Sequence, residues 1–393
     1  MNVRKLTAIA LAALITLGAA SALADTVPLK VWGSQENQAL LGELIEEFKA
    51  ANPGVEWDIS LGVVSEADAQ TRYSEDPAAA ADIFAFANDQ LRTLVTSDSL
   101  SEIAGSRLEA VEAANTAGSV ESATLDGVLY GFPMTADNGY FMYYDKSVFS
   151  EEDVLSLDRM LEVANAAGKK VFMDVSNGWY IASFFLGAGC TLDIGEDGKQ
   201  ICDFNNANGL AAAEAIRKFT ADPAFMTGDD SVLQGGMGGS IAAGVSGTWN
   251  ASAMEDKLGE NYAAAPLPSF TCGGELKHMA SFIGTKILGV NSLSDYVKEA
   301  MQLAEYLTNE ASQLKFFEQR ALGPTNIVAA ANPAVQENIA LAALSAQSAW
   351  GVSQKNVLNG YWGPAEAFGL EMENKSDADL QGLLDQLASQ ATQ

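Results

Sequence analysis

The sequence predicts an α/β fold with two lobes, each built from a sheet covered by helices. The chain has 393 residues, which exceeds the size up to which one hydrophobic core keeps growing. Hydrophobic residues make up 48% of it, which is enough for two cores. Along the chain, short β-type runs alternate with helical patterns, the order typical of a parallel sheet with helices on both faces.

The first half of the chain supplies the clearest elements. Residues 28–32 (PLKVW) form a predicted strand, and the apolar residues between Leu40 and Phe48 recur at helical spacing until an Asn-Pro-Gly sequence ends the helix. Two more strands are expected at 55–61 and 82–87. A second helix is expected to begin near Asp89.

The second half continues the alternation with a weaker pattern. Helices are expected at 151–170, 179–189, 209–223 and 294–320, and strands at 170–175 and 240–249. The last predicted helix covers 376–390, with Ser376 as its N-cap. No period of 20 to 50 residues is present, which excludes a solenoid.

Residues 1–24 are predicted to be a secretory signal peptide. They combine a basic start, a short apolar run and an Ala-Leu-Ala sequence before Asp25. No cysteine follows the apolar run, so we expect no lipid anchor and a soluble mature chain. No later segment approaches the ~20 apolar residues that a membrane span needs.

The formal net charge is -29. A surface this acidic repels nucleic acid and anionic membranes, so neither is an expected partner. The charge is also compatible with a cationic ligand such as a polyamine or a metal ion. The acidic residues are spread along the whole chain, which favours plain solubility.

The three cysteines are Cys190, Cys202 and Cys272. Cys190 and Cys202 flank a segment typical of a hairpin with a turn at 195–198, so they are predicted to pair as a disulfide across its base. Two free buried thiols are the alternative. Cys272 is then unpaired, and nothing near it in the sequence marks it as a nucleophile.

The sequence offers little catalytic or metal-binding chemistry. The glycine-rich run 235–240 lacks the Lys-Ser/Thr ending of a phosphate loop and precedes a predicted strand, which favours a turn. His278 is the single histidine, which argues against zinc sites and histidine-assisted nucleophiles. Acidic pairs such as Glu151–Glu152 and Asp229–Asp230 suit a glycosidase, although 51 acidic residues produce such pairs by chance. We therefore expect no enzyme, no metal and no cofactor.

Four tryptophans, Trp32, Trp179, Trp249 and Trp362, each lie near a predicted strand end or in a loop. Together they are able to line one cleft, where indole faces would stack on the apolar faces of sugar rings. The alternative is that each is a core residue with one N–H to satisfy.

Six segments, in order, resemble the extracellular solute-binding proteins of ABC importers, family 1, in the branch typified by maltose/maltodextrin-binding protein. They are LKVWGSQENQALLGELIEEFKAANPGVEW, ADIFAFANDQLRTLVTSDSLSEI, YGFPMTADNGYFMYYDKSVF, GVSGTWNASAMEDKLGENYAAAPLPSF, ALGPTNIV and NGYWGPAEAFG. They span nearly the whole mature chain.

This resemblance implies a type II periplasmic-binding-protein fold, in which each lobe is a mixed sheet flanked by helices. The chain is expected to cross the hinge three times, near 134–139, 282–287 and 332–340. The implied N-terminal lobe contains residues 25–135 and 285–335, and the implied C-terminal lobe contains residues 138–283 and 336–393.

The resemblance also implies a set of ligand-binding residues. They are Glu36, Phe86, Asp89, Gln90, Asn138, Asn177, Trp179, Trp249 and Trp362. Asp137 lies near the same polar position as Asn138, and Trp32 shapes the cleft floor. Three neighbours depart from the family pattern, because Asn37 and Gln90 replace basic residues and Asn177 replaces a carboxylate.

The function implied is a secreted, soluble periplasmic receptor that captures a neutral, maltodextrin-like oligosaccharide between its lobes and delivers it to the membrane subunits of an ABC importer. We expect a monomer. Two alternatives stay open: the same fold with a cationic or other small solute, and a secreted glycoside hydrolase.

Overall fold

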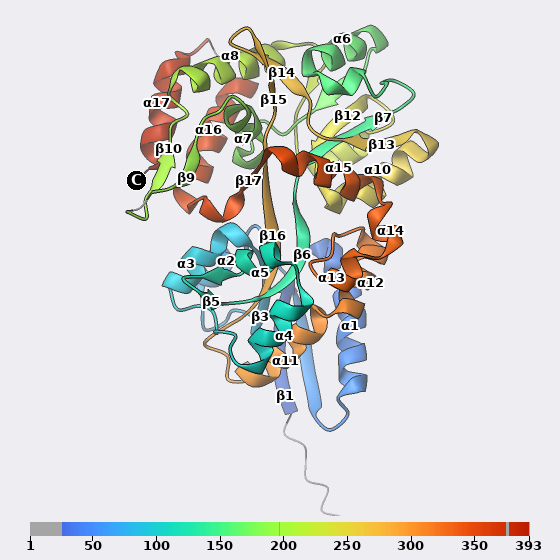
Figure 1. Cartoon of the computed structure of the whole chain (residues 1–393), viewed down its shortest axis with the longest axis vertical. Helices are drawn as coiled ribbons and strands as arrows, with labels where there is room; N and C mark the ends of the chain where they lie inside the picture. Colours follow the sequence, from blue (N-terminus) through green and yellow to red (C-terminus); the bar gives the residue numbers. More distant parts are fainter. Residues whose placement is uncertain (1–25, 196, 375–376, 393) are drawn as a thin grey trace, which may run out of the picture.

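The computed structural model describes residues 26–195, 197–374 and 377–392. The predicted signal peptide and Ser376 lie outside the described residues. Two lobes lie one above the other, and long strands connect them near the middle (Figure 1). Each lobe contains one large sheet and its own buried hydrophobic residues.

The lower sheet has six strands in the order β17-β16-β3-β1-β2, with β6 paired to β16. Strand β1 is parallel to β2 and β3, whereas β16 is antiparallel to β3 and β6, so the sheet is mixed. Its strands are β1 (Thr26–Gly33), β2 (Glu56–Val63), β3 (Ile83–Ala87), β6 (Phe132–Gly139), β16 (Ser281–Val290) and β17 (Gly351–Ser353).

The upper sheet has five strands in the order β11-β8-β12-β7-β13 and is also mixed, because β7 is antiparallel to both of its neighbours. Its strands are β7 (Phe141–Asp145), β8 (Lys170–Phe172), β11 (Phe225–Met226), β12 (Ile241–Ser246) and β13 (Tyr262–Ala265). Strand β6 of the lower sheet leads into β7 of the upper sheet through Tyr140 alone.

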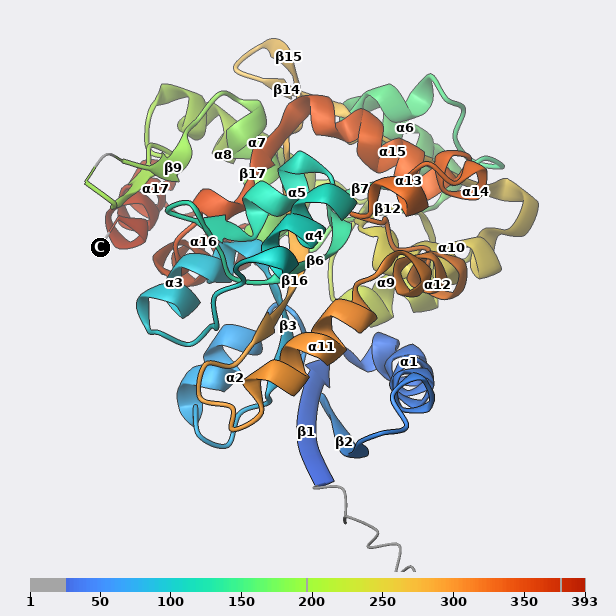
Figure 2. The same cartoon turned by 60° about the horizontal axis from the view of Figure 1, so that its bottom comes forward.

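Helices cover both sheets. Those of the lower lobe are α1 (Gln38–Ala51), α2 (Ala69–Glu75), α3 (Leu91–Thr96), α4 (Ser106–Ala114), α5 (Ala117–Ser122), α11 (Val297–Leu307) and α12 (Glu310–Arg320). Those of the upper lobe are α6 (Leu157–Ala167), α7 (Gly178–Gly187), α8 (Ala207–Ala221), α9 (Asp230–Gly236), α10 (Ala251–Leu258), α15 (Ile339–Gln347), α16 (Trp362–Glu373) and α17 (Leu380–Ala391). The short helices α13 (Ile327–Ala330) and α14 (Pro333–Gln336) lead from α12 to α15. Figure 2 shows α1 and α2 on opposite sides of β1.

Local sequence explains why these helices form where they do. In α1, the predicted apolar stripe from Leu40 to Phe48 is buried against the lower core. Helix α8 begins at an N-cap, Asn206, whose Oδ1 accepts the backbone N–H groups of Asn208 and Gly209 at 2.8 and 3.0 Å. Helix α6 ends at Gly168, whose φ of 65° is the left-handed conformation that glycine adopts without strain.

The C-terminal helix begins later than predicted. Helix α17 starts at Leu380, and its N-cap is Asp379, whose side chain accepts the N–H of Gln381 at 3.2 Å. The expected start at Ser376 placed the cap three residues too early, because Asp379 meets the same capping preference.

Three antiparallel hairpins accompany the large sheets. They are β4 (Thr124–Leu125) with β5 (Val128–Leu129), β9 (Leu192–Ile194) with β10 (Gln200–Cys202), and β14 (Ser269–Cys272) with β15 (Glu275–His278). The hairpin predicted between the first two cysteines is therefore present as β9 and β10.

The predicted disulfide between Cys190 and Cys202 is wrong in this structure. All three cysteines are free and buried. The hairpin register pairs Cys202 with Leu192, so Cys190 lies two residues beyond the end of the ladder, and its Sγ lies 3.7 Å from Oδ1 of Asn206. Burial raises the pKa of Cys190 to about 12 and that of Cys202 to about 11.

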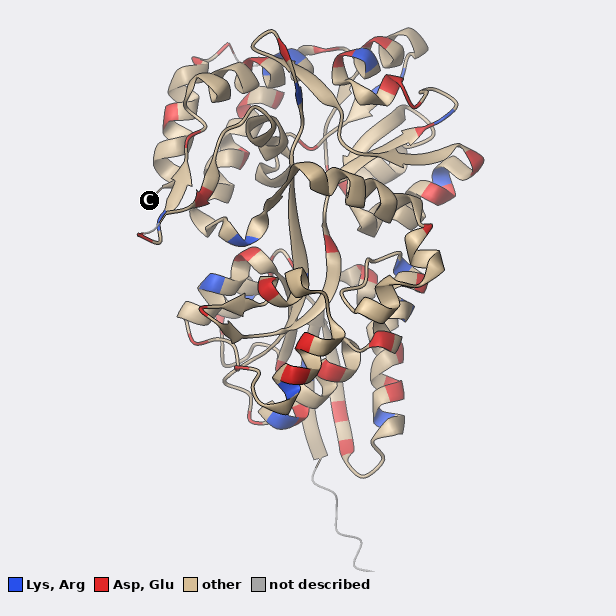
Figure 3. Ribbon diagram, in the orientation of Figure 1, with Lys and Arg blue, Asp and Glu red and all other residues tan. Residues whose placement is uncertain are grey.

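The fold class is confirmed: two lobes, each a mixed sheet flanked by helices. Acidic residues are distributed over both lobes without a single dominant face in this view (Figure 3). In the three described stretches, no helix combines the length and the apolar character that a bilayer crossing requires.

Candidate ligand-binding site

A cavity of about 660 Å³ has walls from both lobes and from the strands that connect them. The lower lobe contributes the ends of β1 and β3 with the loops that follow them, and the upper lobe contributes α7, α9 and α16. Eight predicted ligand residues line it: Glu36, Asp89, Gln90, Asn138, Asn177, Trp179, Trp249 and Trp362. The fold therefore brings together residues that lie up to 326 positions apart.

Three half-buried tryptophans form the aromatic part of the wall. The rings of Trp179 and Trp249 lie 5.7 Å apart at an interplanar angle of 39°. Trp362 packs edge-on against Phe282 and Tyr361. All three also pack against the upper core, so each is both a packing residue and part of the cavity surface. The two interpretations of these tryptophans are thus compatible.

Trp179 occupies the first turn of α7. Its backbone N–H donates to Oδ1 of the N-cap, Asn177, at 3.0 Å, and its indole Nε1 donates to Oε1 of Gln354 at 3.0 Å. Tyr140 packs against the ring with centroids 4.6 Å apart. One hydrogen bond therefore holds the indole and a second holds the backbone of the same residue.

Trp249 lies in the turn after β12, in a Gly-x-Trp sequence. Its Nε1 donates to Oδ2 of Asp230 at 2.9 Å, and Asn250 Nδ2 donates to the other carboxylate oxygen at 2.7 Å. A Cβ on Gly247 would come within 2.0 Å of the indole ring, so only glycine allows this ring position. Nζ of Lys286 lies 5.6 Å from the ring centroid, in cation–π range.

Gln354 connects three segments at the centre of the cavity wall. Its Nε2 donates to Oδ1 of Asp89 at 2.8 Å, and its Oε1 accepts from Asn138 Nδ2 and from the Trp179 indole, both at 3.0 Å. Asp89 belongs to the lower lobe and Trp179 to the upper lobe. A single buried amide thus joins the two lobes through hydrogen bonds.

Asp89 lies at the end of β3 and is buried. Burial raises the pKa of this carboxyl to about 7, against the opposing effect of hydrogen bonds from backbone N–H groups and from Gln354. The carboxyl group therefore changes its charge near neutral pH. A ligand that donates hydrogen bonds to it favours the ionised form.

Glu66 is the centre of a second set of polar contacts in the cavity wall. Its Oε2 lies 3.8 Å from Nζ of Lys286, and its Oε1 accepts from Asn37 Nδ2 at 3.4 Å. The amide of Gln90 donates to the carbonyl oxygens of Glu66 and Ala67 at 2.7 and 2.8 Å. Gln90, which replaces a basic residue of the family pattern, holds this loop against the cavity.

The remaining predicted residues lie nearer the rim or act as caps. Glu36 is exposed in a short 3-10 helix, Gln35–Asn37. Asn177 lines the cavity, but its carboxamide oxygen already accepts the N–H of Trp179. Asn138 is buried on β6 and donates to Gln354.

Three residues that the resemblance placed at or near the site lie outside the lining of this cavity. Phe86 is fully buried in the lower core beside Phe84, because β3 is covered on both faces, and it does not line the cavity. Trp32 packs against Phe84 and also lies outside the lining. Asp137, next to Asn138 on the strand, faces a separate cavity behind the hinge strands.

Sequence reasoning missed several residues of the wall. They are Glu66, Asp230, Lys286, Arg320, Gln354 and Glu366. Asp230 stood out only as one member of a chance acidic pair. Gln354 lies just before the aromatic pair of Tyr361 and Trp362, and no local pattern distinguishes it from other polar residues.

The geometry defines a class of protein. Two lobes enclose a cavity with flat aromatic surfaces on one side and fixed hydrogen-bonding groups on the other. Such a site holds a small molecule that has apolar faces and polar edges. These features define a two-lobed solute-binding receptor.

The chain belongs to the bacterial extracellular solute-binding protein family, whose model matches residues 43–343. It is 27% identical over 384 residues to the galactooligosaccharide-binding protein of Bacillus subtilis (strain 168), covering 92% of this chain and 88% of that protein. The predicted family and its solute-binding function are confirmed.

Solved structures show the same fold. A structure determined with acarbose is 32% identical, with a TM-score of 0.85, covering 93% of this chain and 99% of the other. The ligand-free maltodextrin-binding protein MalE1 from L. casei BL23 is 24% identical, with a TM-score of 0.77, covering 94% and 99% of the two chains.

Proposed function

We propose that this protein is the substrate-binding receptor of an ABC importer, that it captures a neutral, maltodextrin-like oligosaccharide between its lobes, and that it delivers the sugar to the membrane subunits without turning it over. One observation carries the proposal. Trp179, Trp249 and Trp362 line a single cavity opposite buried carboxylate and amide groups of the lower lobe and hinge.

The chemistry of a sugar matches this wall. A pyranose ring has C–H faces that pack on indole rings and a rim of hydroxyls that need donors and acceptors when buried. In the proposed complex, the three indoles stack on successive rings, and Asp89 and Asn138 bond hydroxyls together with Gln354. Glu36, Gln90 and Asn177 shape the edges of the site.

The relatives favour a sugar over the two alternatives. One is a galactooligosaccharide-binding protein, and the structure at 32% identity was determined with acarbose. Both support an oligosaccharide rather than a simple cation, and both support binding rather than hydrolysis. The family model describes binding proteins and gives no support to a glycoside hydrolase.

We further propose that the lobes move about the segments near 134–139, 282–287 and 332–340. These segments separate an N-terminal lobe of residues 25–135 and 285–335 from a C-terminal lobe of residues 138–283 and 336–393. A sugar that contacts both lobes favours the closed form in proportion to its differential affinity, and the permease reads that form. Removal of residues 1–24 on export would leave a soluble, monomeric periplasmic receptor.

The experiment is a titration of the purified mature chain, residues 25–393, followed by intrinsic tryptophan fluorescence. The panel contains α- and β-linked oligosaccharides, polyamines and amino acids. We expect saturation with α-linked oligosaccharides and none with amino acids. Chromatography of the sugars after overnight incubation separates binding from catalysis, because the proposal requires that they remain intact.

A further inference from the structure

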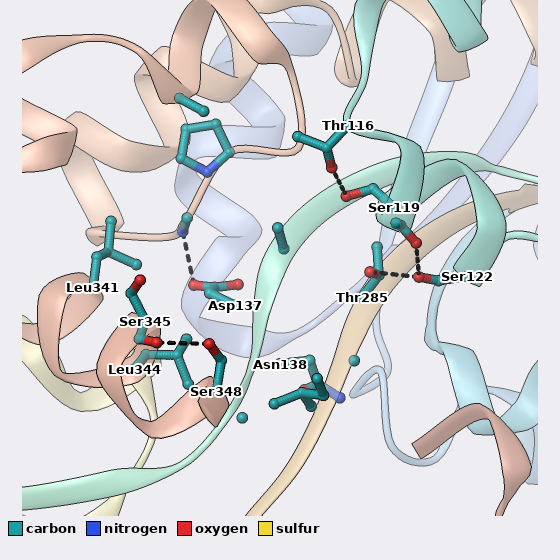
Figure 4. A pocket seen from close by; sticks show the side chains of 18 of the residues that line it. Thr116, Ser119, Ser122, Asp137, Asn138, Thr285, Leu341, Leu344, Ser345 and Ser348 are labelled. Carbon is teal, nitrogen blue, oxygen red and sulfur yellow. Dashed lines mark hydrogen bonds between the residues drawn. The ribbon is translucent and has the colours of Figure 1, made fainter. Parts of the chain in front are cut away.

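A second and larger cavity, of about 900 Å³, lies behind the hinge strands. Its walls come from α5 of the lower lobe, from β6 and β16, and from α15 of the upper lobe. Figure 4 shows Asp137 on β6 between the hydroxyl groups of Thr116, Ser119 and Ser122 and the α15 side chains Leu341, Leu344 and Ser345. We call it the rear cavity, and the cavity of the tryptophans the front cavity.

The lining of the rear cavity mixes apolar side chains with hydroxyl groups, and the charge it carries is negative. The hydroxyl groups come from both lobes: Thr116, Ser119, Ser122, Thr285, Ser345, Ser348 and Ser353. The charged residues among the described lining are Glu121 and Asp137, and no Lys or Arg belongs to it. Glu121 is neutralised, because its Oε1 lies 2.5 Å from Nζ of Lys355.

Asp137 lacks such a neutralising partner. It is 2% exposed. Its Oδ2 accepts from the backbone N–H of Gly323 at 2.8 Å and from Thr248 Oγ1 at 2.5 Å. Its Oδ1 has no hydrogen-bond partner, and the described part of the chain offers Asp137 no ion pair.

A buried carboxylate oxygen without a donor is unusual in a folded protein, because nearly all buried polar atoms have a partner. An unpaired buried charge is the costlier case, and a cationic donor is the partner that satisfies both the charge and the lone pairs. The surrounding hydroxyl oxygens accept hydrogen bonds as well. This wall therefore fits a donor-rich cation.

We propose that the rear cavity binds a small primary ammonium compound of the alkyl diamine class. One ammonium group donates to Oδ1 of Asp137, and the second donates to the hydroxyl oxygens of α5 or α15. The compound would occupy a site separate from that of the sugar, because the indoles and Asp89 belong to the front cavity.

Calorimetric titration of the full mature chain with 1,4-diaminobutane tests this proposal. We expect one saturable site for the wild type and at least a tenfold weaker affinity for Asp137→Asn, which keeps the shape but removes the charge. Asp58→Asn, an exposed acid on β2, removes the same charge elsewhere and should leave the affinity unchanged. The neutral isostere 1,4-butanediol should not bind.

Ser345→Lys keeps the test decisive if Asp137→Asn fails to fold. Ser345 is exposed on α15 and lines the cavity, so the new side chain supplies a tethered ammonium that should abolish diamine binding. The proposal is overturned if the wild type shows no saturable site, if butanediol binds equally well, or if diamine binding is the same in the wild type, Asp137→Asn and Ser345→Lys. The last pattern indicates nonspecific attraction to an acidic surface.

Discussion

The front and rear cavities lie on opposite sides of β6 and β16 and share Asn138, yet their walls differ in kind. The front wall combines three indoles with buried polar groups that hold one another in place. The rear wall combines apolar residues and hydroxyl groups around the unpaired carboxylate of Asp137. Indole rings therefore provide the main surface of the front cavity, and a carboxylate provides the main polar feature of the rear cavity.

Hydrogen bonding explains much of this difference. In the front cavity, the polar side chains fix the aromatic rings: Asp230 holds Trp249, and Gln354 holds Trp179. The recognition surface is therefore rigid before a ligand arrives, which lowers the entropy cost of binding. In the rear cavity, Asp137 anchors backbone and Thr248 with one oxygen and leaves the other without a partner. Fixed aromatic surfaces favour a ligand with matching flat faces, whereas an unpaired charge favours a ligand of opposite charge.

The largest expected effect comes from removing an indole of the front cavity. Trp249→Ala should weaken oligosaccharide binding by about 3 kcal/mol, roughly 100-fold, because apolar burial and stacking are lost together. Calorimetry measures the change. Trp350→Ala removes a tryptophan that lies outside both cavities and should leave affinity unaltered. Equal losses in both variants would show that Trp249 acts through stability alone.

The second prediction concerns pH. If sugar hydroxyls donate to ionised Asp89, affinity should fall as the pH drops through about 7, the raised pKa of this carboxyl. Asp89→Asn should bind about tenfold more weakly at pH 8 and show a flat profile between pH 5.5 and 8. A flat wild-type profile would contradict the role given to Asp89.

Stability of the ligand-free protein should change in the opposite direction. Because the folded-state pKa of Asp89 is raised, the folded chain holds this proton more tightly than the unfolded chain. Its contribution to the free energy of unfolding is present at low pH and is lost as the pH rises from about 4 through about 7. The difference in urea midpoint between the wild type and Asp89→Asn should therefore be smaller at pH 5.5 than at pH 8.

The third prediction tests the amide that joins the lobes. Gln354→Met keeps the length of the side chain but removes three hydrogen bonds, so we expect about a fivefold loss of oligosaccharide affinity. Gln336→Met makes the same exchange in the wall of the rear cavity and serves as its control. If both variants bind the sugar like the wild type, Gln354 does not organise the front cavity.

The smallest effect is expected at the rim. Glu36→Gln should change oligosaccharide affinity by no more than about twofold, since an exposed carboxylate is already well solvated. A tenfold loss in the same titration would mean that Glu36 becomes buried when the ligand binds.

Much of the fold could be predicted from residue patterns. The apolar stripe from Leu40 to Phe48 predicts α1, and the β-type run at 82–87 predicts β3. Helix α15 was missed because its sequence is rich in alanine and leucine and lacks a regular polar face. The disulfide was predicted wrongly because spacing alone does not set hairpin register, and a shift of two residues separates Cys190 from Cys202.

The front cavity was partly predictable for similar reasons. Gly247 and Trp249 form a short motif with a local steric cause, because the indole leaves no room for a Cβ at position 247, and Trp249 lines the front cavity. Gln354 has no such local signal, since its partners Asp89, Asn138 and Trp179 come together only in the folded chain. Phe86 was implied by the resemblance alone, because a strand that is buried on both faces gives no alternation to separate core positions from ligand positions.

The three tryptophans of the front cavity are proposed to bind a neutral oligosaccharide. Calorimetric titration of the mature chain with maltotriose and with matched α- and β-linked galacto-oligosaccharides tests it most directly. We expect one saturable site for at least one of these sugars, and roughly a hundredfold loss of that affinity in Trp249→Ala. Absence of binding to every saccharide in the panel by the folded wild-type protein would contradict it.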